Sequence, residues 1–196
     1  MQNFTDRQIE IMEAATARID QYGIQNLTIK TLSADIGFSE PALYRHFKSK
    51  NAILLGLLHY FILEMKNRIS NIAIPPDAVA GDELRIVFKS QLQTFTNKPA
   101  IVSVIFSEGI FQFDESLRTK VFEVMDIMHQ FVYANIKKGQ KAEHYNHLNN
   151  ASTLTTIILG AIRMVVLKWK ISGHQSNLIV DGSIVLEGIL KMIEHK

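Results

Sequence analysis

Apolar residues recur every three or four positions along most of the chain, which is the spacing of the buried face of an amphipathic helix. The clearest case lies between residues 116 and 138, where Leu117, Val121 and Val124 begin an unbroken stripe. No segment shows the strict alternation of a half-buried strand, and Gly, Pro and Asn residues separate the periodic segments. The pattern predicts an all-α protein with helices over 5–22, 28–36, 39–47, 52–72, 82–96, 100–106, 116–138, 150–172 and 181–194.

Residues 28–50 carry the start and stop signals of two short helices with a tight turn between them. Thr28 can cap the first helix because its hydroxyl accepts a free backbone N–H, and Gly37 can end it in left-handed geometry. Ser39 can cap the second helix, whose first turn tolerates Pro41. Apolar positions at helical spacing assign one face of each helix to a core: Ile29, Leu32 and Ile36, then Leu43 and Phe47. The segment therefore predicts a helix–turn–helix.

The same segment resembles the tetracycline-repressor (TetR/AcrR) family of bacterial transcription regulators. The run Leu43-Tyr44-Arg45-His46-Phe47 follows a capping threonine and a glycine turn and precedes Lys50, in the order found in that family. The likeness covers about the first fifty residues. Ser33 departs from it, since the family more often has alanine there, but serine is small enough for the same helix crossing. The resemblance implies a DNA-binding repressor of double-stranded operators, which is not an enzyme.

We expect two functional domains on this basis. Residues 1–50 should form a three-helix DNA-binding head, and residues 51–196 a six-helix body for ligand binding and dimerisation. The helix over 52–72 would then link the two, although a helix that merely packs in the core is the simpler interpretation. The resemblance further implies that a small hydrophobic effector enters the body and releases the head from DNA.

Charge gives limited support to DNA binding. The formal net charge is only +2, and residues 1–50 contain six basic and six acidic residues. Within residues 28–50, however, four basic residues accompany two acidic ones. Such a local excess of positive charge predicts a modest non-specific affinity for DNA. Defined contacts to the operator should then supply a larger share of the binding free energy.

Contacts to DNA are expected from both helices of the motif. Arg45 is the best candidate for a guanine edge, and contact with the DNA backbone is its alternative role. Glu40 would either accept from a cytosine amine or stabilise the helix N-terminus. The expected phosphate contacts are Thr28, Lys30, Tyr44, Lys48 and Lys50, and the expected groove residues are Glu40, Ala42, Arg45 and His46.

The helix over 150–172 is apolar on more than one face, which is typical of a helix shared with a second subunit or central to a core. We expect it to pair with the last helix and their copies as a four-helix bundle. Such a homodimer would place two recognition helices about 34–36 Å apart on a palindromic operator. The expected interface residues are Leu154, Ile158, Ala161, Val165, Trp169, Leu186, Ile189 and Ile193.

The body is rich in phenylalanine and methionine, which suits the lining of an apolar ligand pocket. Most of these residues would serve equally well as ordinary core. His129 could orient a ligand, or it could be a core or surface histidine with its own partners. The expected pocket residues are Phe88, Phe95, Phe106, Phe111, Phe122, Met125, Met128 and His129.

Several kinds of chemistry are not indicated. The chain has no cysteine, which excludes disulfides and thiolate metal sites. His144 and His147 have a spacing that two metal ligands can use, but no third ligand is apparent, so neither a metal nor a cofactor is expected. A phosphate-binding glycine loop and a nucleophile motif are also missing from the sequence.

The sequence favours a cytoplasmic protein without a membrane span. Asp6 and Glu10 interrupt any secretory signal, and the apolar run over 157–167 contains Arg163 and is shorter than the ~20 residues of a span. Two alternatives to a ligand-released repressor remain. One is a protein of the same fold that is controlled by a protein partner, and the other is a helical enzyme or carrier with an incidental head.

Overall fold

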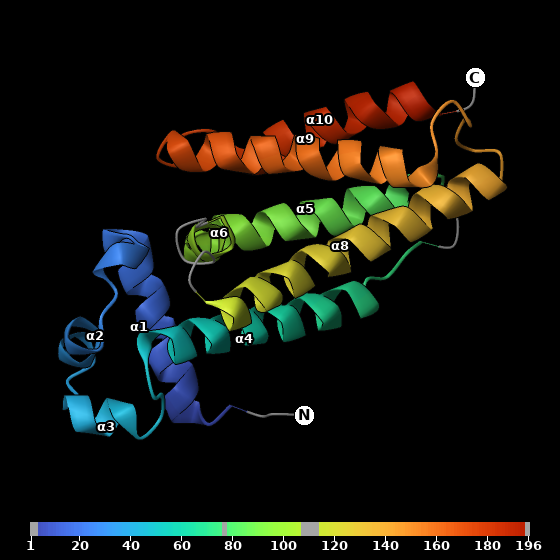
Figure 1. The fold of residues 1–196 in the computed structure, drawn as a ribbon. Helices are drawn as coiled ribbons and strands as arrows, with labels where there is room; N and C mark the ends of the chain where they lie inside the picture. Colours follow the sequence, from blue (N-terminus) through green and yellow to red (C-terminus); the bar gives the residue numbers. More distant parts are fainter. Residues whose placement is uncertain (1–3, 76–77, 107–113, 195–196) are drawn as a thin grey trace. The chain divides into compact units, whose positions relative to one another are not determined.

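The structure is a computed structural model that describes residues 4–75, 78–106 and 114–194 (Figure 1). Within these ranges it contains α-helices, one 3-10 turn (η1) and no strand beyond an isolated bridge between Tyr145 and Glu194. The all-α prediction is therefore confirmed. The elements are α1 (Asp6–Tyr22), η1 (Ile24–Asn26), α2 (Ile29–Asp35), α3 (Glu40–Tyr44), α4 (Lys50–Ser70), α5 (Asp82–Asn97), α6 (Pro99–Ile105), α8 (Glu115–Lys141), α9 (Ala151–Ile171) and α10 (Leu178–Ile193).

The caps expected from the sequence form the helix–turn–helix. The hydroxyl of Thr28 accepts the backbone N–H of Thr31, and that of Ser39 accepts the N–H of Ala42. Gly37 adopts a φ of 67°, where a residue with a Cβ would be strained. These contacts start α2 and α3 and end α2 where predicted. As a regular helix, α3 is shorter than the expected 39–47, because it ends at Tyr44 and continues as a turn.

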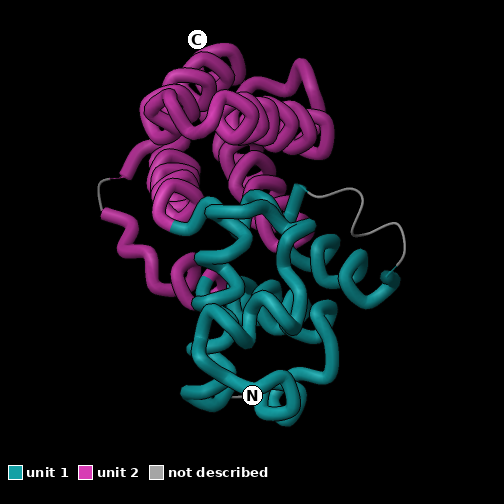
Figure 2. The backbone as a smooth tube through the Cα atoms, turned by 90° about the vertical axis from the view of Figure 1, so that its left-hand side faces the viewer, with its two compact units in different colours: residues 1–64, 98–124 teal, residues 65–97, 125–196 magenta. Residues whose placement is uncertain are grey.

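The chain forms two compact units, which Figure 2 distinguishes by colour. Unit 1 comprises residues 1–64 and 98–124, and unit 2 comprises residues 65–97 and 125–196. In unit 1, α1 packs against η1, α2 and α6, and α2 packs against α3. Its core contains completely buried side chains, among them Ile11, Leu32, Leu43 and Leu54.

Unit 2 is a layered arrangement in which α10 packs against both α5 and α9. Gly182 on α10 permits this approach, since a side chain there would overlap Leu92 of α5. Arg85 of α5 reinforces the same contact through two hydrogen bonds to the carboxylate of Glu187, at 2.6 and 3.0 Å. This pairing lowers the pKa of Glu187.

Two helix boundaries differ from the sequence expectation. The sequence predicts that this helix ends at residue 138, before Gly139, but α8 continues through the glycine to Lys141. The ring of Tyr145 occupies the space that a side chain at position 139 would fill, so this glycine serves packing. The last helix starts at Leu178, earlier than expected, because the side chain of Asn177 accepts the N–H of Val180 and supplies the cap.

Helix α9 is long and apolar enough to cross a membrane when judged only by length and composition. One side of it is nevertheless buried inside the protein, where Ile158 and Val166 are at most 1% exposed. Its other side carries Met164 at 63% exposure and Ile171 at 77%. An apolar helix of a protein core gives the same signal as a membrane span.

Candidate DNA-binding surface

Recognition helix α3 is anchored by one face and exposed on the other. Leu43 is completely buried, and Phe47 in the following turn is only 6% exposed. Glu40, Tyr44 and Arg45 are consequently exposed, and Tyr44 has 48% of its surface accessible. The other two groove candidates, Ala42 and His46, are half-buried. The arrangement leaves a polar surface with one cation, Arg45, which suits a DNA groove.

The expected phosphate-binding residues fall into two groups. Thr28, Lys30 and Lys48 are exposed, although the hydroxyl of Thr28 is already used in capping α2. Lys50 is half-buried, and its ammonium donates a hydrogen bond to the carbonyl oxygen of Ile24 at 2.9 Å. Burial lowers the pKa of Lys50. This lysine therefore stabilises the η1 turn, independently of any contact that it makes with DNA.

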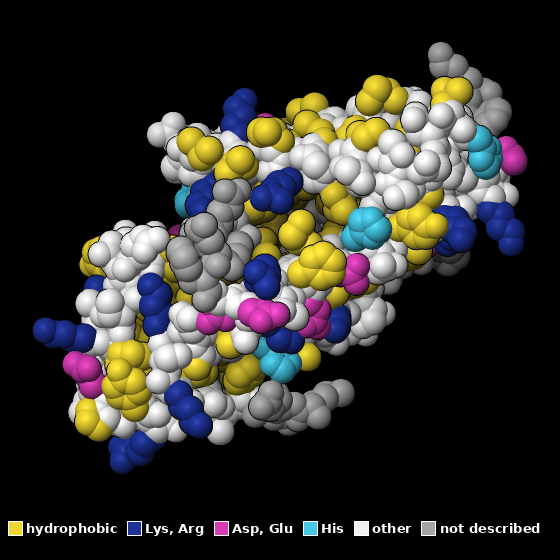
Figure 3. Space-filling model, viewed as in Figure 1, with side chains coloured by type: hydrophobic (Ala, Val, Ile, Leu, Met, Phe, Trp, Pro, Cys, Tyr) yellow, Lys and Arg dark blue, Asp and Glu magenta, His cyan; other side chains and the backbone are white. Residues whose placement is uncertain are grey.

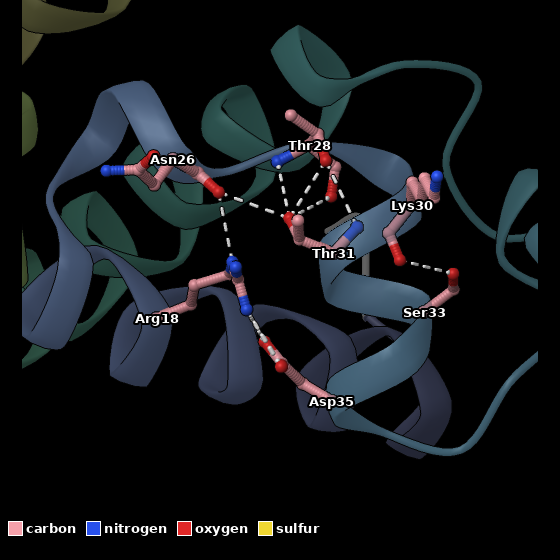
Figure 4. Close-up of polar contacts among 7 residues, drawn as sticks. All are labelled: Arg18, Asn26, Thr28, Lys30, Thr31, Ser33 and Asp35. Carbon is pink, nitrogen blue, oxygen red and sulfur yellow. Dashed lines mark hydrogen bonds and ion pairs between the residues drawn. The ribbon is translucent and has the colours of Figure 1, made fainter.

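A polar network that the sequence did not predict holds α2 against α1 (Figure 4). The guanidinium of Arg18 donates to both carboxylate oxygens of Asp35, at 2.8 and 2.7 Å, and to the carbonyl of Asn26 at 3.0 Å. The hydroxyl of Thr31 donates to the same carbonyl at 3.1 Å. Nη1 makes both contacts with Asp35 and Nε makes the contact with Asn26, so the planar guanidinium holds these two residues at a fixed spacing. Arg18 thus positions the helix that precedes α3.

The turns on either side of α3 are also held by α1. The side-chain amide of Gln8 donates to the carbonyl of His46 at 3.4 Å. The guanidinium of Arg7 lies over the ring of Phe38, 5.3 Å from its centre. Polar residues on one side of α1 thereby support both ends of the recognition helix. Local sequence patterns carry no sign of such contacts, because their partners lie far apart in the chain.

The expected ligand-pocket residues are distributed over different environments. Phe88, Phe95 and Met128 are buried, with exposures of 2%, 9% and 9%. Phe122 and Met125 are 68% and 48% exposed and point away from the interior. The remaining three are Phe106, which is half-buried at the end of α6, His129, which is half-buried and stacks on Tyr133, and Phe111, which lies outside the described residues.

The expected dimer-interface residues mostly face the interior of their own protomer. Six are buried, and only Ala161 and Val165 are partly accessible. Apolar side chains that reach the surface occupy the neighbouring positions of the same two helices, and they are visible along α9 and α10 in Figure 3. The buried six are Leu154, Ile158, Trp169, Leu186, Ile189 and Ile193, and the exposed neighbours are Ile157, Met164, Ile171, Val180, Ile184 and Met192.

The two histidines with metal-ligand spacing do not form a cluster with further ligands in the part of the chain that the structure describes. His144 is exposed. The ring of His147 lies 3.1 Å from the carbonyl oxygen of Gln140, which places it in the loop after α8.

Comparisons with known proteins agree with this geometry. Residues 11–57 match the model of bacterial regulatory proteins of the tetR family, a range that contains α2, α3 and the start of α4. The nucleoid occlusion factor SlmA of Photobacterium profundum is 23% identical over 159 residues, which cover 81% of each protein.

Solved structures share the fold over almost the full length. A transcriptional regulator from Saccharomonospora viridis in complex with choline superimposes with a TM-score of 0.82 and 20% identity, covering 97% of this chain and 99% of that one. FadR from Bacillus subtilis in complex with stearoyl-CoA gives a TM-score of 0.75 and 19% identity, covering 95% and 99%. Residues 11–57 therefore form a helix–turn–helix domain of the tetR family type, and these structures show that the whole chain shares the fold of such regulators.

Proposed function

We propose that the chain is a dimeric repressor that binds a palindromic operator through α3 and is released from it by a small hydrophobic effector. The observation that carries the proposal is the anchoring of α3: Leu43 is fully buried while Arg45 is exposed. A rigidly held helix with a cation on its free face can make a guanine contact. A repressor of this kind acts in the cytoplasm, where its DNA is.

Dimerisation supplies the second recognition helix that a palindrome requires. The exposed apolar side chains of α9 and α10, such as Met164 and Ile184, support a two-fold interface at these helices. Large apolar residues that are 63% and 65% exposed are more stable when a partner covers them. We assign the interface to these outward positions and retain Ala161 and Val165 at its edge.

Small-molecule control is supported by what similar folds bind. Two structural relatives were solved in complex with choline and with stearoyl-CoA. Both ligands carry apolar or quaternary groups, so the fold accommodates such chemistry in those proteins. A coupling of about 1–3 kcal/mol between effector and DNA would change operator occupancy usefully.

The test begins with selection of DNA sequences from a random library by the purified protein. We expect an inverted repeat whose half-sites lie about one helical turn apart. Arg45→Ala should relax the base preference at one position of each half-site, at a cost of about 1–3 kcal/mol. Lys48→Ala is the matched control, since it should weaken binding to all sequences equally. Selection of no repeat by the wild-type protein would contradict the proposal.

Control by a protein partner is the second candidate function. The observation in its favour is the likeness to SlmA, a nucleoid occlusion factor, over 81% of the chain. Exposed Phe122 and Met125 on α8 offer apolar side chains to such a partner. A panel of hydrophobic compounds that fails to release the selected DNA, while a captured protein does release it, would favour this candidate.

A further inference from the structure

A groove within unit 1 has no role in the functions described so far. Its volume is about 780 Å³, within the ~300–1,000 Å³ of typical ligand sites. The start of α1, the first turns of α4 and the first turns of α8 line it. None of the pocket residues expected from the sequence contributes to it. The groove is therefore a separate candidate site.

The lining of the groove combines apolar and polar side chains. Phe4, Phe47 and Leu55 supply aromatic and aliphatic surface. His59 and Lys120 add an imidazole ring and an ammonium group to the same lining. Lys120 also pairs with Glu123 at 2.7 Å, but an ammonium has three donors and can bind a second acceptor.

The remaining charged group at the groove is the carboxylate of Glu115, whose side chain is 86% exposed. Water and salt screen a charge in that position, so it opposes an anion in the groove only weakly. His59 makes an edge contact with Phe4 but no hydrogen bond to another described residue. This chemistry suits an apolar or aromatic compound with a single anionic group.

The groove is directly connected to the recognition helix. Phe47 belongs to the turn after α3, and Gln8, which also lines the groove, donates to the carbonyl of His46. Gly56 brings α4 close to the same turn, because a Cβ there would lie 3.1 Å from the ring of Phe47. A compound that displaces Phe47 or engages the amide of Gln8 would therefore shift the end of α3.

We propose that this groove binds monoanionic apolar or aromatic compounds and that occupancy lowers DNA affinity by moving the end of α3. Binding of these compounds in the groove does not depend on the proposed function. Their effect on DNA affinity does depend on it.

The test uses two fluorescent probes with the full chain. 1-Anilinonaphthalene-8-sulfonate is an aromatic anion, and N-phenyl-1-naphthylamine is its uncharged analogue. Lys120→Gln should lower the affinity for the anionic probe about three- to tenfold and leave the affinity for the neutral probe unchanged. Ser116→Trp places a large ring at the groove from an exposed position and should weaken both probes at least tenfold. Lys141→Gln is the control, because Lys141 is exposed at the last residue of the same helix and does not line the groove.

The outcomes separate the site from the proposed function. Unchanged probe affinity in Lys120→Gln and Ser116→Trp, with loss of binding in Phe122→Ser, would overturn the site. Circular dichroism of each variant excludes misfolding. With the site established, saturating anion should lower the affinity for selected DNA several-fold in the wild type and not in Ser116→Trp. If the anion does not change the affinity for DNA, the proposed coupling is wrong. If the protein does not bind DNA even when no probe is present, only the proposed function is contradicted.

Discussion

The ammonium of Lys50, at the first residue of α4, donates to the carbonyl oxygen of Ile24 in the η1 turn at 2.9 Å. The lysine that the sequence assigned to a phosphate thus has a partner inside the protein. Its burial lowers its pKa, in contrast to the exposed side chain of Lys48 two residues earlier. The two lysines should therefore behave differently when replaced.

Lys50→Ala should lower the free energy of unfolding by about 1 kcal/mol through loss of this hydrogen bond. Lys48→Ala should leave it within about 0.5 kcal/mol, as expected for an exposed site. Each variant should reduce the slope of log K against log salt by about one unit if its ammonium contacts a phosphate. Urea unfolding and DNA titrations over a salt series measure the two effects. Equal stability of both variants would show that the Ile24 contact contributes little.

Arg18→Lys should destabilise the protein by about 1–2 kcal/mol, because Arg18 reaches Asp35 through Nη1 and the Asn26 carbonyl through Nε, whereas lysine has a single nitrogen for both sites. The control is Arg118→Lys, whose ion pair with Glu115 is largely exposed and should contribute little. Thermal unfolding measures the difference. DNA affinity, measured well below the transition, should fall for Arg18→Lys, since α2 supports α3. Retained DNA affinity would mean that the network stabilises the fold without positioning the recognition helix.

Ile184→Glu should convert the proposed dimer to a folded monomer. Ile184 is 65% exposed on α10, so its replacement affects a partner surface and leaves the core intact. Leu186→Glu is the contrasting variant, because Leu186 is 2% exposed and a buried carboxylate should unfold unit 2. Sedimentation velocity and circular dichroism distinguish the two outcomes. A dimer that persists in Ile184→Glu would place the interface elsewhere.

Burial raises the pKa of Tyr145 from 10.0 to about 12. Its phenol holds a proton more tightly in the folded state, so its contribution to stability is full below pH 10 and is lost as the pH rises to about 12. A shift of two pKa units corresponds to about 2.7 kcal/mol. Tyr145→Phe cannot titrate, and between pH 9 and 12 the wild type should lose about this much more stability than the variant. Urea unfolding at both pH values tests this, and parallel losses would contradict it.

The helix–turn–helix could be predicted from sequence because its signals are local. Thr28, Gly37 and Ser39 each act on backbone groups within a few residues, so their chemistry is visible in the sequence. The end of α8 was not predicted correctly, because the role of Gly139 depends on a side chain outside the helix. A glycine that makes room for Tyr145 looks the same in sequence as one that ends a helix.

The dimer candidates illustrate a second limit. Periodicity identifies α9 as apolar on several faces but does not distinguish the face toward α10 from the face toward solvent. Ile158 and Met164 are equally plausible in the sequence, yet one is fully buried and the other 63% exposed. Arg18 was missed because its partners, Asn26 and Asp35, lie on other elements.

The composition of unit 1 has a consequence for biosynthesis. Helix α1 packs against α6, which begins only at Pro99, and the same unit includes residues up to 124. The helix–turn–helix therefore leaves the ribosome long before its supporting helices exist. At about 5–20 residues per second, several seconds separate the two. During that interval the nascent head lacks the α6 contact that stabilises α1, so DNA-binding competence comes late in translation, after residues 65–97 have been made.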